Sequence, residues 1–518
     1  MVVHDTITIF DFGGQYTQLI ARRIRRLGVY AEIVPHNTTL SNVRHSKGLI
    51  FSGGPSSVYE TDFPRYDLQI PNSGIPLLGI CLGMQALAHQ FGGRVQRGKI
   101  GEYGSSTITI KDPARIFVGL SAQEKVWMSH GDSVEELPDG FKVLAMSEDG
   151  IVAAFSNPEK QVYGFQFHPE VSHTQDGTKM LENFVLDICG CNQNWTPGNY
   201  IQETRERVRQ QIGSSDSVVF VSGGVDSTVS YFLVAGTEDI GRLYPIFVNN
   251  GLLRKGEAEE VQERLTRLGV KGLIYADYSK MFLDRLKGVT DPEMKRHIIG
   301  DSFIEVQEAE MKRLDIDKNA FLVQGTLYTD LIETGFGVGK DAHNVKTHHN
   351  VGSRLVREKR KLGLLIEPLS ELFKDDVRYV GLELDLPEET IWRHPFPGSG
   401  LAIRMIGEVT PKRLATLREV DWRYVQELKN LGLYRQIWQA FAALTGVQSV
   451  GIMGDKRAYK EVAVLRAVKS EDGMTAEPFD FPKGVLQRIS ERIVNEVPDI
   501  GRVLYDTTPK PPATIELE

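Results

Sequence analysis

The stretch PLLGICLGMQALAHQ, residues 76–90, decides the fold of the first part of the chain. Its first five residues predict a buried strand, and the residues that follow Cys81 predict a helix. Gly79 and Gly83 flank the cysteine and permit a tight, strained turn that lifts the sulfur clear of the sheet. At the start of a helix the dipole favours a thiolate, and the Leu82 amide can donate to an oxyanion. A buried structural cysteine is the alternative, and the flanking glycines favour the nucleophile.

Short β-branched runs alternate with helical patterns through most of the chain, which predicts parallel α/β layers. The segment 15–27 predicts a helix, and the region from about 100 to 166 predicts hairpins. The segment 191–199 contains Asn, Gln, Pro and Gly residues and predicts a linker. Strands are expected at 6–10, 48–51, 107–110, 161–167, 217–221 and 462–468.

The composition limits the possible classes of protein. A length of 518 residues exceeds what one hydrophobic core usually organises, so roughly two to four domains are expected. Sixty Lys and Arg against 68 Asp and Glu give a net charge of −8, which argues against a general nucleic-acid binder. No run approaches about 20 apolar residues, and residues 1–10 lack the pattern of a secretory signal. Cys189 and Cys191 are expected to be structural, and the small number of cysteines indicates the cytosol.

A His-Pro-Glu sequence downstream offers partners for the cysteine. His168 and Glu170 stand two residues apart, and on an extended segment both side chains would face the same pocket. The imidazole would act as base and acid, and the carboxylate would orient it and stabilise its charged form. Ser-Gly-Gly-Pro at 52–55 follows a predicted strand, so the Gly54 amide is a candidate second oxyanion donor. Each motif is weak alone, and their combination with Cys81 predicts one catalytic site.

A second strand-loop-helix predicts a nucleotide site. Ser-Gly-Gly-Val-Asp-Ser, residues 222–227, turns from a strand into a helix, and its small residues let several amides converge on a phosphate. The loop lacks the Gly-Lys-Ser/Thr ending of a Walker A motif. Asp226 suits a Mg²⁺ that bridges a leaving pyrophosphate. The predicted ATP-binding residues of this segment are Ser222, Gly223, Gly224, Val225, Asp226, Ser227 and Thr228.

Three parts of the chain resemble known families. Residues 6–190, with the cysteine turn and His-Pro-Glu, resemble the class I glutamine amidotransferases. The 222–227 loop resembles the pyrophosphatase loop of enzymes that split ATP into AMP and pyrophosphate. Arg-His-Pro-Phe-Pro-Gly at 393–398, Gly-Ile-Met-Gly-Asp at 451–455 and Lys-Pro-Pro-Ala-Thr-Ile-Glu at 510–516 resemble the C-terminal domain of the GMP synthetase family.

The resemblance implies an α/β protein with three domains. The first is a class I amidotransferase domain at 4–195. The second, at 196–393, is an ATP-pyrophosphatase domain with a parallel α/β fold like that of the adenine-nucleotide α-hydrolases. A smaller α+β domain at 394–518 would dimerise and bind xanthosine monophosphate (XMP). The implied reaction releases ammonia from glutamine, adenylates the XMP C2 oxygen with loss of pyrophosphate, and displaces AMP by ammonia to give GMP. The implied assembly is a cytosolic homodimer that binds neither nucleic acid nor membranes.

The resemblance also implies roles for residues outside the loop. Lys374, within Leu-Phe-Lys-Asp-Asp at 372–376, would meet the ATP phosphates, and Asp375 would assist the Mg²⁺. The alternative for this charged run is a solvated helix start. The residues implied for XMP binding are Arg296, Arg404, Lys510 and Glu516.

Three histidines resemble a zinc site only superficially. His343, His348 and His349 have no cysteine or well-spaced carboxylate beside them, so we expect them near the nucleotides and not on a metal. The chain also departs from the family's pattern without losing a catalytic group, which bears on loop rigidity and substrate affinity. These departures are Asn249, Thr329, Ser353, Ser399 and Leu517.

Two other interpretations of the sequence compete with GMP formation. A related amidotransferase could form NAD or thiouridine, but an NAD-forming enzyme would lack the 510–516 ending. Thiouridine formation needs a cysteine near the ATP loop, and all three cysteines precede Ser222. A catalytically idle scaffold is the alternative from another class, and an assay of glutamine-dependent AMP release would separate it from an enzyme.

Overall fold

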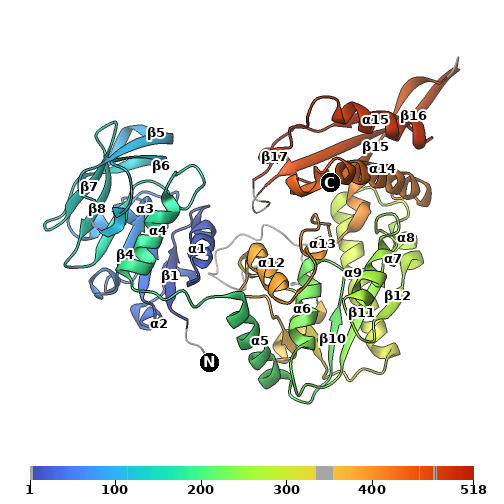
Figure 1. Cartoon of the computed structure of the whole chain (residues 1–518), viewed down its shortest axis with the longest axis horizontal. Helices are drawn as coiled ribbons and strands as arrows, with labels where there is room; N and C mark the ends of the chain where they lie inside the picture. Colours follow the sequence, from blue (N-terminus) through green and yellow to red (C-terminus); the bar gives the residue numbers. More distant parts are fainter. Residues whose placement is uncertain (1–3, 114, 334–353, 454–455, 471–472, 474) are drawn as a thin grey trace. The chain divides into compact units, whose positions relative to one another are not determined.

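The computed structural model describes residues 4–518 apart from 114, 334–353, 454–455, 471–472 and 474. The chain separates into two compact units, one that ends at Tyr200 and one that begins at Ile201 (Figure 1). Four residues discussed above lie outside the described residues. They are the three histidines and one residue that differs from the family's pattern, namely His343, His348, His349 and Ser353. In the part of the chain that is described, no helix is long and apolar enough to cross a bilayer.

A nine-stranded sheet forms the centre of the first unit. Its strands are β1 (Thr6–Asp11), β2 (Tyr30–Pro35), β3 (Gly48–Phe51), β4 (Leu77–Ile80), β5 (Arg94–Ile110), β6 (Gln123–Glu136), β7 (Lys142–Ser147), β8 (Val152–Asn157) and β9 (Val162–Phe165). They follow the order β2-β1-β3-β4-β9-β8-β7-β5-β6, parallel from β2 to β9 and antiparallel beyond. Strands β3 and β4 are buried at every position, because parallel strands are covered on both faces.

The helices of this unit confirm the predicted alternation of strands and helices. They are α1 (Thr17–Arg26), α2 (Leu40–Val43), α3 (Leu82–Gln90) and α4 (Gly177–Glu182). Helix α3 begins directly after Cys81 and packs against β4 (Figure 1). The hairpins expected between about 100 and 166 are present as β5 to β9.

The segment 191–199, which was predicted as a linker, lies beside the boundary between the two units and packs on the first of them. Trp195 is buried, and its amide donates to the Gly28 carbonyl at 2.8 Å. Its ring lies 4.7 Å from the Tyr30 ring, so the segment buries aromatic surface against the first unit. Helix α5 (Pro197–Ile212) then begins inside the same segment.

The second unit contains a parallel five-stranded sheet, which confirms the second α/β layer. Its strands are β10 (Ser217–Phe220), β11 (Leu243–Asn249), β12 (Ile274–Asp277), β13 (Phe321–Val323) and β14 (Leu365–Ile366), in the order β12-β11-β10-β13-β14. The helices of this part are α6 (Val225–Ala235), α7 (Glu257–Arg267), α8 (Ser279–Leu286), α9 (Pro292–Arg313), α10 (Tyr328–Glu333), α11 (Arg354–Lys361), α12 (Lys374–Glu383) and α13 (Glu388–Ile391).

The last part of the second unit carries a separate, mostly antiparallel sheet. Its elements are α14 (Pro411–Asn430), β15 (Gln439–Met453), β16 (Lys456–Lys469), β17 (Glu477–Pro478), α15 (Val485–Glu496) and β18 (Ile500–Tyr505). Strand β16 pairs antiparallel with β15 and β17 and parallel with β18. One hydrophobic core joins this sheet to α8 and α9, since Phe282 and Ile299 pack in the same cluster as Leu444 and Ile489. This shared core packs α8 and α9 against the C-terminal elements.

Candidate functional site

The turn at Cys81 is strained, as the sequence predicted. Cys81 has φ 52 and ψ −108, a conformation that L-residues rarely adopt and that is common at functional sites. The strain is carried by the cysteine and not by its glycines. A Cβ on Gly79 would lie 2.5 Å from the Gly83 backbone, and a Cβ on Gly83 would lie 2.3 Å from the Phe51 carbonyl oxygen. The two glycines therefore permit close packing of β3, β4 and α3 around the cysteine.

His168 and Glu170 form a buried ion pair beside this turn. His168 Nδ1 donates to Glu170 Oε1 at 2.7 Å, and the carboxylate side chain is 1% exposed. Burial lowers the pKa of His168, but the charges and hydrogen bonds of Glu170 and Cys81 outweigh it and hold this pKa well above its ordinary value. A protonated imidazole next to the sulfur stabilises the thiolate.

The pair does not lie on an extended strand, so the predicted reason for their proximity is wrong. Strand β9 ends at Phe165, His168 follows it in irregular backbone, and Glu170 lies in the turn that comes next. Two side chains hold the backbone of this segment. Thr174 Oγ1 donates to the His168 carbonyl at 2.6 Å, and Arg23 Nε donates to the Glu170 carbonyl at 3.0 Å. A direct hydrogen bond, and not the alternation of a strand, brings imidazole and carboxylate together.

The structure gathers all five residues predicted for the first site. A Cβ on Gly53 would lie 3.0 Å from His168 Cε1 and 3.6 Å from Cys81 Cβ, so this backbone adjoins both. A Cβ on the next residue, Gly54, would lie 2.8 Å from Leu82 Cδ2. Sequence reasoning missed Tyr16, whose ring meets the His168 ring edge-on at 5.1 Å, because nothing in its spacing points to that histidine.

The other two cysteines are buried or half-buried free thiols, in agreement with a structural role. Burial raises the pKa of Cys191 to about 12 and the pKa of Cys189 well above its ordinary value. Both thiols are therefore neutral and poor nucleophiles near neutral pH.

The 222–227 loop has the form of a phosphate site. Gly223 has a positive φ of 75°, and α6 begins two residues later. Ser227 Oγ accepts from the Ser222 amide at 3.1 Å, and the Gly224 amide donates to Ser222 Oγ at 3.3 Å. Thr228 Oγ1 donates to the Gly224 carbonyl at 2.8 Å. The loop thus places small polar groups and the positive end of a helix dipole at one point.

Asp226 and Lys374 meet directly in this site. Lys374 Nζ lies 2.7 and 2.5 Å from the two carboxylate oxygens of Asp226. Asp375, the other predicted metal ligand, lies with Oδ1 at 3.4 Å from Arg378 Nη1. Within the described residues no three His, Cys, Asp or Glu side chains form a cluster that could hold a metal ion. A protein site of one or two carboxylates still fits Mg²⁺, which commonly completes its ligands with substrate phosphates and waters.

The C-terminal tail brings together three of the four residues predicted for XMP. Arg404 is fully buried and forms a bidentate pair with Glu516, both hydrogen bonds being 2.9 Å long. The Arg296 guanidinium donates to the carbonyl of Glu518, and Lys295 pairs with the carboxylate of the same residue. These contacts tie the end of the chain to α9 and to the segment 400–404.

Two further observations refine this second cluster. Sequence reasoning missed Gln439, whose Nε2 donates to Glu516 Oε1 at 2.7 Å. Its position at the start of β15 carried no motif that could have identified it. Lys510 is held elsewhere on the sheet, because its backbone pairs with Ala476 and its Nζ donates to the Gly473 carbonyl at 2.7 Å.

Comparison with known proteins finds matches to the part of the chain that contains Cys81 and to the part that contains the C-terminal sheet. Residues 8–188 match the class-I glutamine amidotransferase family, and residues 426–517 match the GMP synthase C terminal domain. The chain is 50% identical over 518 residues to the glutamine-hydrolyzing GMP synthase of Caldicellulosiruptor saccharolyticus, covering 99% of this chain and 100% of the relative. It is also 50% identical over 516 residues to that of Carboxydothermus hydrogenoformans and over 515 residues to that of Aquifex aeolicus, with 99% of each chain covered. The chain therefore belongs to the family of glutamine-hydrolysing GMP synthases.

Proposed function

We propose that this chain makes GMP from XMP, with glutamine as the nitrogen donor and ATP as the activating substrate. The observation that carries the proposal is the presence of two sites in one chain: Cys81 beside the His168–Glu170 pair, and a phosphate loop whose Asp226 pairs with Lys374. Identity to glutamine-hydrolyzing GMP synthases along nearly the whole chain supports XMP as the acceptor.

Ammonia formation is the task of the first site. The Cys81 thiolate attacks the side-chain amide carbon of glutamine, and the amides of Gly54 and Leu82 stabilise the oxyanion. The His168 imidazolium gives its proton to the leaving ammonia, which breaks the C–N bond and leaves a glutamyl thioester. His168 then activates the water that hydrolyses the thioester, while Glu170 keeps the imidazole oriented.

Activation of the acceptor is the task of the second site. The amides and hydroxyls of residues 222–228 hold the ATP phosphates, with Lys374 as an additional cation. The XMP C2 oxygen attacks the α-phosphorus and pyrophosphate leaves; ammonia then attacks C2 and AMP leaves. Mg²⁺ held by Asp226 and Asp375 together with ATP would neutralise the charge that develops on the pyrophosphate.

The XMP site is assigned to Arg296, Arg404 and Glu516, with Lys510 joining it if its Nζ leaves the Gly473 carbonyl for the ligand. A carboxylate at Glu516 can accept from a base N–H, and a lysine at Lys510 can meet the 5′-phosphate as a point charge. The hydrogen bonds of Arg404 and Gln439 hold the Glu516 carboxylate in one orientation, which favours selection of one base.

The proposal extends to domains, assembly and compartment. We assign the amidotransferase domain to 4–195, the ATP-pyrophosphatase domain to 196–393 and the XMP-binding domain to 394–518. Homodimerisation through the last domain is supported by exposed apolar side chains on its sheet, since Val447, Val450 and Tyr459 are 61, 49 and 66% exposed. Three free thiols favour the reducing cytosol.

One experiment tests the function. The full chain is incubated with ATP, Mg²⁺ and glutamine, and XMP or an alternative acceptor such as a nicotinic acid dinucleotide is added. We expect GMP, AMP, pyrophosphate and glutamate in equal amounts with XMP. Product from another acceptor, or AMP release without an aminated nucleotide, would contradict the proposal.

A further inference from the structure

The carbonyl of Gly223, within the phosphate loop, is held by two arginines. Arg393 Nη1 donates to it at 2.9 Å and Arg264 Nη2 donates to it at 3.0 Å. A side chain at this position would be strained and would displace its neighbours, because Gly223 has a φ of 75° and a Cβ on it would lie 2.6 Å from Val261 Cγ1. Two charge-assisted hydrogen bonds on one carbonyl fix that peptide more firmly than a single neutral bond could.

This clamp determines where the next amide points. In a trans peptide the C=O and the following N–H point in opposite directions. Since the Gly223 carbonyl points to the arginines, the Gly224 N–H points into the loop, where it donates to Ser222 Oγ. The two guanidinium groups also polarise the peptide, which makes the Gly224 N–H a stronger donor to a phosphate oxygen.

Arg393 is itself oriented by a buried carboxylate. Its Nη2 donates to Glu257 Oε1 at 2.7 Å, and the Arg254 amide donates to the other Glu257 oxygen at 2.9 Å. Burial raises the pKa of Glu257, but Arg393 and Arg254 outweigh it, so this pKa lies below its usual value. Burial and the like charge of Arg393 lower the pKa of Arg264 to about 10, which leaves Arg264 charged at neutral pH.

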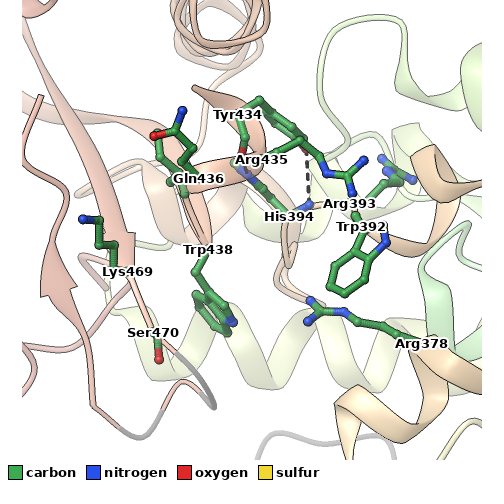
Figure 2. Close-up of a pocket in the computed structure, with 11 residues that line it drawn as sticks. Arg378, Trp392, Arg393, His394, Tyr434, Arg435, Gln436, Trp438, Lys469 and Ser470 are labelled. Atoms are coloured by element: carbon green, nitrogen blue, oxygen red, sulfur yellow. Dashed lines mark hydrogen bonds between the residues drawn. The ribbon is translucent and has the colours of Figure 1, made fainter. Parts of the chain in front are cut away.

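The residue after Arg393 connects the clamp to β15. The Ala440 amide donates to His394 Nδ1 at 3.2 Å, so His394 Nε2 carries the proton and donates to the Tyr434 carbonyl at 2.8 Å. Burial lowers the pKa of His394 to about 4, which keeps this tautomer neutral. Figure 2 shows Arg393 and His394 at the same cavity. The His394 ring stacks on the Tyr434 ring, with the ring centroids 3.7 Å apart.

A second path reaches the same strand. Arg254 Nη2 donates to the Ala440 carbonyl at 3.3 Å, and the Arg254 guanidinium lies 3.2 Å from Asp421 of α14. Ala440 follows Gln439, which donates to Glu516 at 2.7 Å. Hydrogen bonds, together with the chain links from Arg393 to His394 and from Gln439 to Ala440, therefore run from the Gly223 carbonyl to the carboxylate assigned above to XMP.

We propose that Arg393 is a positioning residue that sets the phosphate loop for ATP and transmits XMP occupancy at Glu516 to that loop. The inference rests on the proposed function, because it assigns the two ends of the contact chain to ATP and XMP. A ligand that orders Gln439 and Glu516 would steady Ala440, His394 and Arg393, and thereby the Gly224 amide. By thermodynamic linkage, ATP and XMP would then raise each other's affinity by the same factor.

The test uses the full chain with ammonium as the nitrogen source, so that the Cys81 site does not contribute. We compare wild type with Arg393→Lys, which keeps the charge but cannot reproduce a planar fork on Gly223 and Glu257. The KM for ATP should rise about tenfold, as expected when a reacting group is held less accurately. The Kd for XMP is then measured with and without a non-hydrolysable ATP analogue. The factor between the two values should exceed 1 in wild type and fall toward 1 in the variant.

Arg435→Lys is the matched control. Arg435 lines the same cavity of about 210 Å³ as Arg393 (Figure 2). It pairs with Glu388 at the surface, whereas the hydrogen bonds to the Gly223 carbonyl come from Arg393 and Arg264. Its KM and its linkage factor should equal those of wild type. Glu257→Gln removes the carboxylate partner of Arg393 without changing Arg393. It should shift the KM for ATP and the linkage factor in the same direction as Arg393→Lys, and it replaces that variant if Arg393→Lys fails to fold.

The outcomes separate the inference from the function on which it rests. The role of Arg393 would be overturned if both Arg393→Lys and Glu257→Gln kept the wild-type KM for ATP and the wild-type linkage factor. It would also be overturned if Arg435→Lys changed these two quantities as much as Arg393→Lys does. A linkage factor of 1 in the wild-type chain would overturn the transmission between sites. Absence of GMP from ammonium, ATP and XMP in the wild type would instead reject the proposed function.

Discussion

Lys374 contacts both carboxylate oxygens of Asp226, although 148 residues separate them in the chain. Lys374 begins α12, and Asp226 lies in the first turn of α6. The pair therefore joins two helix N-termini, where an anionic phosphate is favoured. In the ATP complex we expect Lys374 to turn toward the phosphates, which frees the carboxylate for Mg²⁺.

Asp226→Asn should lower GMP formation about 100-fold or more with both glutamine and ammonium, the scale of removing one preorganised electrostatic group. Asparagine keeps the size of the side chain but loses the charge that attracts Lys374 and a divalent cation. Steady-state rates with each nitrogen source measure the effect. Asp375→Asn is a useful comparison, since its carboxylate lies near Arg378, and a smaller loss is expected. A normal rate of Asp226→Asn with ammonium would refute the role of Asp226.

Cys81→Ala should abolish GMP formation from glutamine and leave formation from ammonium close to wild type. In the proposed mechanism the thiol takes part only in the release of ammonia. It lies in the unit that ends at Tyr200, whereas the 222–227 loop lies in the other unit. Parallel assays with glutamine and with ammonium chloride measure this division. Cys191→Ala is the control, since the high pKa of this thiol excludes a nucleophilic role, and it should retain both activities. Loss of both activities in Cys81→Ala would contradict the division of labour.

Glu170→Gln should move the alkaline limb of glutamine hydrolysis to lower pH. Glu170 and Cys81 raise the pKa of His168 against the effect of burial, so removal of the carboxylate lets this pKa fall. The imidazolium that protonates the leaving ammonia is then lost at a lower pH. A pH profile of glutamate release measures the shift, and an unchanged alkaline limb would show that Glu170 does not set the charge of His168.

The same pair affects stability with a defined sign. A histidine with a raised folded-state pKa stabilises the fold fully below its unfolded pKa of about 6.5 and loses that contribution as the pH rises through the folded value. The difference in the free energy of unfolding between wild type and Glu170→Gln should therefore be largest at low pH and shrink toward alkaline pH. Denaturant titrations at several pH values provide the measurement.

Glu516→Gln should weaken XMP binding more than ATP binding. The glutamine cannot form the charged bidentate pair with the fully buried Arg404, so the guanidinium loses its counter-charge. Breaking a buried pair costs about 3–5 kcal/mol, and the remaining amide oxygen reduces that cost. Equilibrium titrations with each nucleotide, together with a thermal melt, separate lost affinity from lost stability. Equal weakening of both nucleotides would indicate general damage to the second unit and count against the assignment of Glu516 to XMP.

The sequence by itself determined the reactive groups and their local turns. The Cys81 turn and the 222–227 loop were predicted because a few adjacent residues dictate their backbone, whereas the His-Pro-Glu segment was predicted as extended and lies beyond the end of β9. Short apolar runs likewise predicted the parallel strands, since a buried strand requires only a local pattern. The local pattern at 191–199 predicted a linker beside the boundary between the two units, but it did not predict that Trp195 packs against the first unit.

Only the tertiary structure decided which distant groups meet. Asp226 with Lys374, Arg404 with Glu516, and Arg393 with Gly223 are joined across 148, 112 and 170 residues. Such contacts depend on strand order and on the shared core of the second unit, which no local pattern specifies. The tertiary structure also showed that Gly79 and Gly83 serve close packing, because the distance from a glycine to a neighbouring backbone is a property of the folded chain.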